Sequence, residues 1–547
     1  MRYLGCDRHS DEANKPLARL LFRRVALFTV AAILTVLQTA QVIQAQAANI
    51  YLAQNAAGSG NGADCNDALA YTFFNTSANW GSGSGKIGPG TTVHLCGTIT
   101  GTAGQTGLTF QGSGTSGNPI TLLFETGANL TAPYWAASGA IAATGKSNLV
   151  INGGTNGIIQ NTQNGTGLTY QQSSTGIYLK NVTNVTVENL TVANICQHTS
   201  NTDFTGCTSA TGPTGIGCDS GCVNVLWTHN VVHDVLSSYW YGSSPGDSLT
   251  ISYSTTYRTG NFNAYPGGSG TFSSFSFIGN DISCVVGSNC NWDTTQDTWH
   301  EEALHVFVGS GAAVSGYVIA DNYFHDWNGD VTGMLNFEPN GGTITNMYVY
   351  NNVFVHTGGY AASGGSNSMH YYNNTLVSSG NFDYLTSSDQ LYNNIFDANG
   401  VGEIFESGAT GVTSNNNDFY SLTQAASVGG TNYSTLAAWQ SGSTGICSGG
   451  CDTNSIATNP NIGSSAPDFV PQTGSPVIGA GTNLTSLCST QALLCQSAPQ
   501  TFGVNYACGT GCLSRPASGP WDVGAFQASG ESIVPPTPPS GLTASVQ

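Results

Sequence analysis

A short alternation of apolar and polar positions recurs along the chain. Each copy has a short apolar strand, one or two polar residues, an Asn that we call the anchor, and a second short apolar strand. Side chains that alternate with a period of two lie on opposite faces of a strand, so the pattern predicts strands rather than helices. The clearest copies have as anchors Asn230, Asn280, Asn322, Asn352, Asn374, Asn394 and Asn417.

The anchors recur at intervals that set the length of one structural repeat. The last four lie 22, 20 and 23 residues apart, and earlier intervals of 50, 42 and 30 residues leave room for one coil with a long excursion or for two coils. Three residues past each anchor the side chains are mixed, which predicts an outward face. Two residues past it they are large and apolar, which predicts one interior column of Val232, Ile282, Phe324, Phe354, Leu376, Phe396 and Phe419. The pattern therefore predicts a solenoid, in which each coil contacts its neighbours.

Asn at the anchor has two physical roles in this prediction. Asn tolerates the left-handed backbone conformation of a tight bend better than most residues do. Stacked Asn amides can also hydrogen-bond from one coil to the next, each bond contributing about 1 kcal/mol net. Looser copies of the pattern place further anchors at Asn152 and Asn189.

With these Asn-anchored coils, residues 140–425 resemble the secreted right-handed parallel β-helix proteins of the pectin-lyase-like superfamily. The resemblance implies an all-β fold, a right-handed parallel β-helix with long loop excursions and a C-terminal closing element. Known members of this superfamily include pectate and alginate lyases, polygalacturonases, epimerases and non-enzymatic surface proteins, so the resemblance implies one of these functions. We expect the chain to divide into a signal peptide (1–47), an N-terminal cap with the first coils (48–140), the β-helix body (141–425), a C-terminal closing unit (426–528) and a Pro-rich tail (529–547).

The N-terminus has the pattern of an export signal. Arg23 and Arg24 precede an apolar run from Val25 to Leu37, and small residues surround a predicted cleavage site after Ala47. The run is shorter than the roughly 20 residues that cross a bilayer. We therefore expect a secreted, periplasmic or cell-surface protein without membrane insertion.

The cysteines fall in neighbouring pairs. Of 15 in the chain, Cys6 lies in the predicted leader. An even number in an exported chain predicts disulfides, with structural zinc as the alternative. The expected pairs are Cys65/Cys96, Cys196/Cys207, Cys218/Cys222, Cys284/Cys290, Cys447/Cys451, Cys488/Cys495 and Cys508/Cys512.

Charge narrows the range of partners. Only 7% of the residues are charged, which argues against long amphipathic helices and, with 10% aromatic residues, against disorder. Without residues 1–47, the totals fall from 11 Lys and Arg and 30 Asp and Glu to 5 and 27, a net charge of −22. Because a phosphate-binding surface needs clustered cations, nucleic acid is excluded as a partner. We expect a monomer whose partner is a polysaccharide.

The densest group of ionisable residues lies between Asp293 and Glu338. Hydrolysis of a glycosidic bond needs two carboxyl groups, one to protonate the leaving oxygen and one to activate water or attack directly. Our preferred catalytic set combines Glu338 with an acid of the preceding excursion, chosen from Asp297, Glu301 and Glu302. The predicted substrate-binding residues are Trp299, Asn336, His300 and Asp326.

Elimination from a uronate polymer is the competing chemistry. The lyases that the coils resemble commonly use Lys or Arg as the base, and here Arg258 is the first candidate and Lys180 the second. For elimination the resemblance implies calcium as a cofactor that neutralises the substrate's acid, whereas the other interpretations need no cofactor. Hard carboxylate oxygens are the ligands that calcium prefers. The predicted ligands are Asp293, Asp297, Glu301 and Glu302. A polyanion would, however, be repelled by a chain of this net charge. We therefore predict a polysaccharide hydrolase or lyase, with a non-catalytic glycan-binding or surface structural protein as the alternative.

Strand register predicts which of these side chains face outward. The intervals from His305 to Asn322 and from Leu335 to Asn352 are equal, so the two strands that they begin are expected to stack. In that register Asn336 and Glu338 point outward, whereas His305 shares the inward face of Leu335. A bulge of one residue would reverse the position of His305.

Overall fold

The computed structural model describes residues 48–197, 214–243, 248–266, 270–283, 302–327, 334–357, 366–380 and 382–528. The chain separates into two units, Met1–Ala48 and Asn49–Gln547, and the second contains all of the described strands. The predicted leader (1–47) and tail (529–547) lie outside the described residues.

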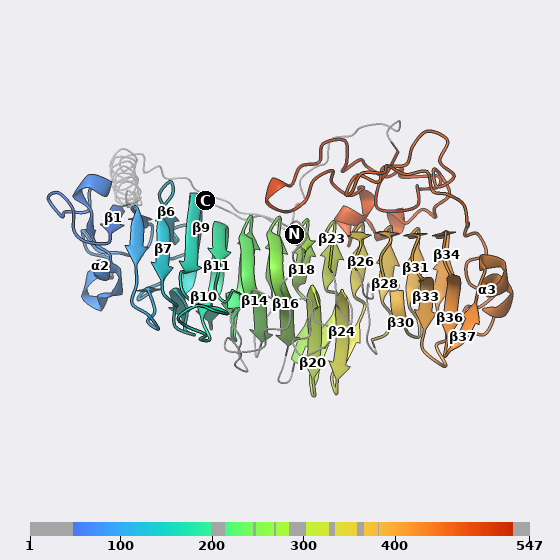
Figure 1. The fold of residues 1–547 in the computed structure, drawn as a ribbon, viewed down its shortest axis with the longest axis horizontal. Helices are drawn as coiled ribbons and strands as arrows, with labels where there is room; N and C mark the ends of the chain where they lie inside the picture. Colours follow the sequence, from blue (N-terminus) through green and yellow to red (C-terminus); the bar gives the residue numbers. More distant parts are fainter. Residues whose placement is uncertain are drawn as a thin grey trace, which may run out of the picture. The chain divides into compact units, whose positions relative to one another are not determined.

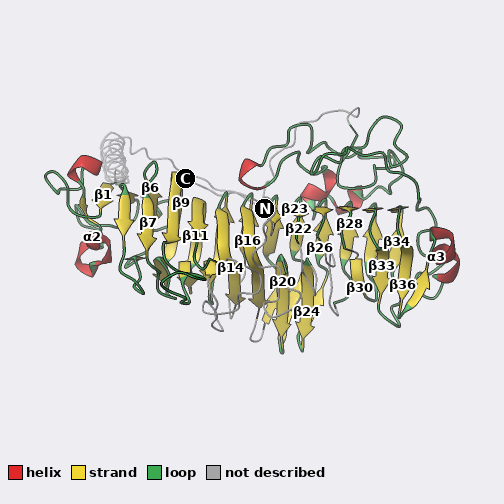
Figure 2. Ribbon diagram, viewed as in Figure 1, coloured by secondary structure: helices red, strands yellow, loops and turns green. Residues whose placement is uncertain are grey.

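The second unit is an all-β parallel β-helix, as predicted (Figure 1). A coil adds one strand to each of three faces, and the strands of these faces pair in parallel with their equivalents in neighbouring coils. Strands dominate the unit, and the α-helices α2 (Thr72–Asn75) and α3 (Leu436–Gly442) lie at opposite ends of the stack (Figure 2).

The first face contains β1 (Asn49–Ala53), β3 (Thr92–Leu95), β6 (Ile120–Phe124), the first parts of β9 (Ser147–Asn161) and β11 (Thr183–Ala193), β13 (Val223–Thr228), β15 (Leu249–Ser252), β18 (Phe275–Ile278), β22 (Val318–Ala320), β26 (Tyr348–Tyr350), β28 (His370–Tyr372), β31 (Gln390–Tyr392) and β34 (Thr413–Asn415). The second contains β4 (Thr98–Thr100), β7 (Asn129–Ala132), the last parts of β9 and β11, the first parts of β14 (Val231–Ser243) and β16 (Thr255–Pro266), β19 (Asp281–Ser283), β23 (Tyr323–His325), β27 (Val353–Val355), β29 (Thr375–Val377), β32 (Ile395–Asp397) and β35 (Asp418–Tyr420).

The third face contains β5 (Leu108–Thr109), β8 (Ile141–Thr144), β10 (Thr175–Lys180), β12 (Thr214–Cys218), the last parts of β14 and β16, β20 (Leu304–Gly309) and β24 (Leu335–Asn340). Smaller sheets join β17 (Gly270–Phe272), β21 (Ala312–Ser315) and β25 (Thr343–Thr345), and β30 (Phe382–Leu385), β33 (Val401–Phe405), β36 (Gln424–Val428) and β37 (Thr431–Tyr433). The short β2 (Leu69–Ala70) pairs with β1.

The anchor Asn residues form the predicted ladder of side-chain amides. Oδ1 of Asn352 accepts from the backbone N of Asn322 at 3.0 Å and from its Nδ2 at 3.0 Å. The same two bonds link Asn352 to Asn374, at 3.0 and 3.1 Å, and the ladder continues through Asn394 to Asn417. These side chains are fully buried, so the bonds satisfy groups that water cannot reach.

One part of the explanation for the anchor Asn was wrong. The left-handed residue is the one before the anchor, such as Asn351 with φ 56° and Asn373 with φ 52°. Asn189 occupies this left-handed position, with φ 56°, and is not an anchor. Its neighbour Leu190 takes the anchor's place, because the Leu190 backbone N donates to Oδ1 of Asn230. The anchors are therefore Asn because of their amides, and not because of their own backbone conformation.

The interior column is also as predicted. Ile282, Phe324 and Phe354 are consecutive strand partners, and the rings of the last two stack at 4.9 Å. Phe396 and Phe419 continue the column further on. The interval of 50 residues holds two coils, because Thr256 takes the inward position between Val232 and Ile282. In that extra coil Ser254 replaces the anchor: its Oγ accepts from the Asn230 backbone N at 3.2 Å.

Residues 457–528, which we call the C-terminal segment, fold back along two of the three faces (Figure 1). Phe469 and Phe502 pack against outward side chains of β23 and β27 on the second face, and Trp521 packs against Tyr350 and Tyr372 on the first. The buried Arg515 holds this segment together by donating to the backbone O atoms of residues 522, 524 and 525. The contacts of the segment are thus with the first and second faces.

Five of the predicted disulfides are present: Cys65–Cys96, Cys218–Cys222, Cys447–Cys451, Cys488–Cys495 and Cys508–Cys512. Cys196 is also disulfide-bonded, and its predicted partner Cys207 lies outside the described residues, as do Cys284 and Cys290. Such disulfides are consistent with an extracellular protein. In the described residues, no helix has the length and apolar character needed to span a membrane.

Asn374→Ala is expected to lower the free energy of unfolding by about 3 kcal/mol, because it leaves buried donors of Asn352 and the O atom of Val349 without their partner. Chemical denaturation followed by circular dichroism measures the loss. Asn454→Ala, at an exposed Asn near the end of the stack, is the control and should change the midpoint little. Equal effects of the two substitutions would contradict a stabilising ladder.

Two carboxyl groups are buried near the ladder. Asp389 accepts from the backbone N atoms of Met369 and Thr386, and Asp418 accepts from that of Thr458. Burial raises the pKa of Asp389 to about 7 and that of Asp418 to about 8, in spite of these hydrogen bonds. Both groups therefore hold a proton in the folded chain at pH values where the unfolded chain has lost it.

Stability is expected to fall as pH rises from about 4 to about 8, because the folded chain binds more protons than the unfolded chain over this range. Asp418→Asn mimics the protonated form, so it should flatten the decline. Denaturation midpoints measured at intervals across the range test this. A midpoint of the parent chain that stays constant or rises would contradict it.

Candidate functional site

The outward side of β20 and β24, on the third face, brings several predicted site residues together. Leu304 pairs with Leu335, and both are buried in the core. His305 is therefore the partner of Asn336, and Phe307 is the partner of Glu338. This register places His305 on the outward side, beside Asn336 and Glu338, so the expected inward position of His305 was wrong.

A difference of one residue between two turns causes this change. Gly309 pairs with Asn340, and Ala313 pairs with Thr343. Three residues of the β20–β21 turn therefore stand opposite two residues of the β24–β25 turn. The expected register was counted back from Asn322 and Asn352 without this extra residue. The expected positions in β20 are therefore displaced by one residue relative to β24. In a strand, a shift of register by one residue moves each side chain from the inward face to the outward face, or the reverse.

The acid–histidine cluster consists of Glu302, His305, Asn336 and Glu338. Nε2 of His305 lies 3.1 Å from Oε2 of Glu338, and Nδ1 lies 3.8 Å from Oε2 of Glu302. Nδ2 of Asn336 donates to Oε1 of Glu302 at 3.1 Å. Glu302 and His305 are 0% and 1% exposed, whereas the Glu338 side chain is 42% exposed. His305 thus lies between a buried Glu, at 3.8 Å, and Glu338, the one acid of the cluster that solvent reaches.

Asp326 lies elsewhere, at a corner of the second face. His325 has Nδ1 at 3.0 Å from Oδ2 of Asp326 and Nε2 at 2.8 Å from Oδ1 of Asp281. Burial alone would lower the pKa of His325, but the hydrogen bonds to these two carboxylates outweigh it and raise the pKa to about 9. Asp326 is therefore engaged with a His on another face than Glu338. The predicted residues Asp293, Asp297, Trp299, His300 and Glu301 lie outside the described residues.

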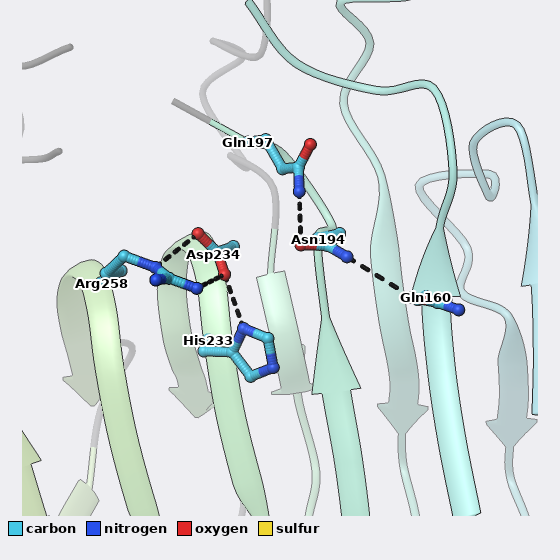
Figure 3. A network of polar contacts seen from close by, with 6 residues as sticks. All are labelled: Gln160, Asn194, Gln197, His233, Asp234 and Arg258. Atoms are coloured by element: carbon cyan, nitrogen blue, oxygen red, sulfur yellow. Dashed lines mark hydrogen bonds and ion pairs between the residues drawn. The ribbon is translucent and has the colours of Figure 1, made fainter. Parts of the chain in front are cut away.

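Arg258 belongs to a polar network at the corner between the second and third faces (Figure 3). Nε and Nη2 of Arg258 donate to the two oxygens of Asp234 at 2.8 and 2.5 Å, and Nδ1 of His233 lies 2.6 Å from Oδ2. The His233 ring stacks on Tyr257 at 4.5 Å. The hydrogen bond to Asp234 raises the pKa of Arg258. Arg258 is therefore held as a cation, which makes it a poor base.

The same network continues toward the N-terminus. Nε2 of Gln197 donates to Oδ1 of Asn194 at 2.6 Å, and Nδ2 of Asn194 donates to Oε1 of Gln160 at 3.4 Å. Asn194, Asp234 and Arg258 follow one another at the same corner and all have positive φ. Sequence reasoning missed the ion pair, although Asp234 and Arg258 are 24 residues apart, close to the length of one coil.

Of the four predicted calcium ligands, the structure describes Glu302. Its side chain is enclosed, with Oε1 bonded to Asn336 and Oε2 facing His305. Among the described residues, no group of three or more His, Cys, Asp and Glu side chains is arranged to hold a metal ion. The other three predicted ligands, Asp293, Asp297 and Glu301, lie outside the described residues.

Comparison with known proteins adds likenesses of fold. No family model matches the chain, and no curated protein matches it. Among solved structures it is similar to a pectate lyase, Pel9A, at 14% identity and a TM-score of 0.45, over 88% of this chain and 97% of that one. It is also similar to a GH136 lacto-N-biosidase from Eubacterium ramulus (12%, TM-score 0.38, 70% of this chain and 66% of that one) and to a rhamnogalacturonan lyase (13%, 0.36, 76% and 90%). The strand pairing of this chain itself identifies the fold as a parallel β-helix.

A double-mutant cycle tests the structural role of the ion pair at the corner. Arg258→Gln and Asp234→Asn should each destabilise the chain, and their effects should be coupled by about 1–2 kcal/mol, because each removes the partner of the other. Denaturation curves of the parent, both single variants and the double variant give the coupling. Additive effects would show that the bidentate contact contributes no stability.

Proposed function

We propose that the chain is an exported protein that binds a polysaccharide along the third face and hydrolyses it at Glu338. One observation carries the proposal. The half-exposed carboxyl group of Glu338 lies on the third face, which the described contacts of the C-terminal segment leave uncovered, and it contacts His305, which lies beside the buried Glu302. That the ligand is a carbohydrate is inferred from the resemblance of the Asn-anchored coils to pectin-lyase-like β-helix proteins. The leader pattern and the five disulfides support export.

Glu338 is the group that exchanges a proton with the glycosidic oxygen. Its Oε2 is within hydrogen-bond distance of Nε2 of His305, so a proton can be shared between the two side chains. Glu302 is completely buried and cannot flank a sugar ring, so it acts as a positioning residue for His305. The second carboxyl group that hydrolysis needs is assigned to the preceding excursion, where Asp297 and Glu301 are the candidates.

Hydrolysis is favoured over elimination because both candidate bases are occupied. Arg258 is bonded bidentately to Asp234. Nζ of Lys180 lies 2.5 Å from Oδ2 of Asp219, and this hydrogen bond raises the pKa of Lys180. Both side chains keep their protons at neutral pH and cannot accept one from a substrate. Elimination with calcium at Asp293, Asp297 and Glu301, and glycan binding without cleavage, are the alternatives that a cleavage assay separates.

Glu338→Gln should lower the rate of polysaccharide cleavage by roughly 10²- to 10⁴-fold, because the amide cannot transfer the proton. Release of reducing ends from a panel of neutral and uronic polymers, with and without chelator, measures cleavage. Absorbance from unsaturated ends in the same samples reports elimination.

Glu125→Gln is the matched control. Glu125 is also a partly exposed Glu that contacts a His, with Oε1 at 2.6 Å from Nδ1 of His94, but it lies on the first face near the N-terminal end. Its substitution should leave cleavage unchanged. Full activity of Glu338→Gln would reject the site, unsaturated products would reject hydrolysis, and cleavage of no polymer by the parent chain would favour a binding protein.

A further inference from the structure

A pocket of about 320 Å³ lies on the third face, on the N-terminal side of the acid–histidine cluster. Its lining includes Thr175, Tyr178, Thr214, Gly217, Asp219 and Trp240. Small-molecule pockets in proteins typically have volumes of roughly 300–1,000 Å³, so this one suits a ligand of modest size. Its lining combines two aromatic rings with hydroxyl and carboxylate groups.

The pocket exists because a Gly stands between two aromatic residues. Tyr178, Gly217 and Trp240 are consecutive partners on β10, β12 and β14. A Cβ added to Gly217 would lie 3.2 Å from Cγ2 of Thr214 and 3.6 Å from Cβ of Trp240, so even a small side chain would begin to fill the space. Strands two coils apart are separated by about 10 Å, which leaves a gap between the positions of Tyr178 and Trp240.

The polar side of the pocket is centred on Asp219. The hydroxyl of Tyr178 donates to Oδ2 of Asp219 at 3.0 Å, and Lys180 forms an ion pair with the same oxygen. Thr175 and Thr214, which pair with each other on β10 and β12, add two further hydroxyl groups to the lining. Fixed polar groups beside an aromatic surface match a pyranose ring, which has an apolar C–H face and a rim of hydroxyl groups.

Charge excludes an acidic sugar as the favoured ligand. Between residues 48 and 547 the chain has five Lys and Arg residues, of which Lys180 lies on β10 of the third face and Arg258, paired with Asp234, lies at its corner. The charge of Lys180 is already balanced by Asp219. A uronate in the pocket would therefore meet the carboxylate of Asp219 without an excess positive charge. A neutral sugar meets no such penalty.

The pocket and the acid–histidine cluster share one row of the third face. Trp240 pairs with Asn263, Asn263 with His305, and His305 with Asn336. Three coils separate Trp240 from Asn336, a distance of about 14 Å. A polymer that runs along the coils can therefore place one sugar in the pocket and a linkage a few units away at Glu338.

We propose that this pocket binds one neutral pyranose unit of the polysaccharide, so that the substrate is a neutral rather than a uronic polymer. The inference rests on the proposed function for its polymer and adds the substrate class and a binding site. Trp240 and Tyr178 provide the stacking surfaces, Gly217 provides the space, and Asp219 accepts hydrogen bonds from sugar hydroxyls.

Affinity electrophoresis of the full chain tests the proposal. The gels contain xylan, mixed-linkage β-glucan, galactomannan or arabinan as neutral polymers, and polygalacturonate or alginate as acidic ones, each with calcium and with chelator. We expect retardation by at least one neutral polymer. Trp240→Ala should weaken it by about tenfold, because the stacking surface is lost. Gly217→Val should weaken it similarly by filling the space.

Gly445→Val is the matched control, because a Cβ at this exposed Gly meets nothing within 4 Å. Circular dichroism melting confirms that each variant is folded. Retardation by acidic polymers alone, or by no polymer, would overturn the proposal. Retardation by a neutral polymer that both pocket variants retain would also overturn the pocket assignment. None of these results depends on cleavage, so they are distinct from a failure of Glu338 as the catalytic group.

Discussion

Parallel hydrogen bonding between successive coils is the constraint on which the rest of the structure depends. A parallel coil can stack only if each turn returns the chain to the same register, and the buried Asn ladder fixes that register at one point in each coil from Asn280 to Asn417. From Asn322 to Asn417, Oδ1 of each anchor accepts from both the backbone N and the side-chain amide of the anchor before it, as between Asn374 and Asn352. With this point fixed, the three strands of a coil align with their partners, and large residues such as Phe324 and Phe354 stack inside.

The same constraint explains how clusters of polar side chains are built on the surface. Residues separated by one coil in sequence become neighbours in space, so a cluster is built from side chains about one repeat apart. Glu302 and Asn336, which are 34 residues apart, share a hydrogen bond, and Asp234 and Arg258 form an ion pair across 24 residues. The C-terminal segment buries outward side chains of the first and second faces through Phe502 and Trp521. The third face carries the pocket and the acid–histidine cluster.

The fold could be predicted from the sequence because its signal is repeated in every coil. A pattern found many times tolerates local errors, and the displacement of Asn189 by one position did not affect the fold assignment. The orientation of His305 had no such redundancy. It depends on a single extra residue in the turn between β20 and β21, which no periodic pattern reveals. The outward positions of Asn336 and Glu338 were predictable because they alternate with the apolar Leu335 and Phe337 within β24.

The pocket was beyond sequence reasoning for a different reason. Gly217 is one of 71 Gly residues in the chain, and many of those in the described residues have a positive φ, as at turns. Its role appears only when the register places it between Tyr178 and Trp240. Likewise, the sequence reveals that Lys180 is one of few cations, but the fold is needed to show that Asp219 neutralises it. In a solenoid the coil sequence therefore predicts the scaffold, whereas the chemistry of a face arises from residues that meet across coils. Specificity can thus change through substitutions on one face without disturbing the anchors that maintain the stack.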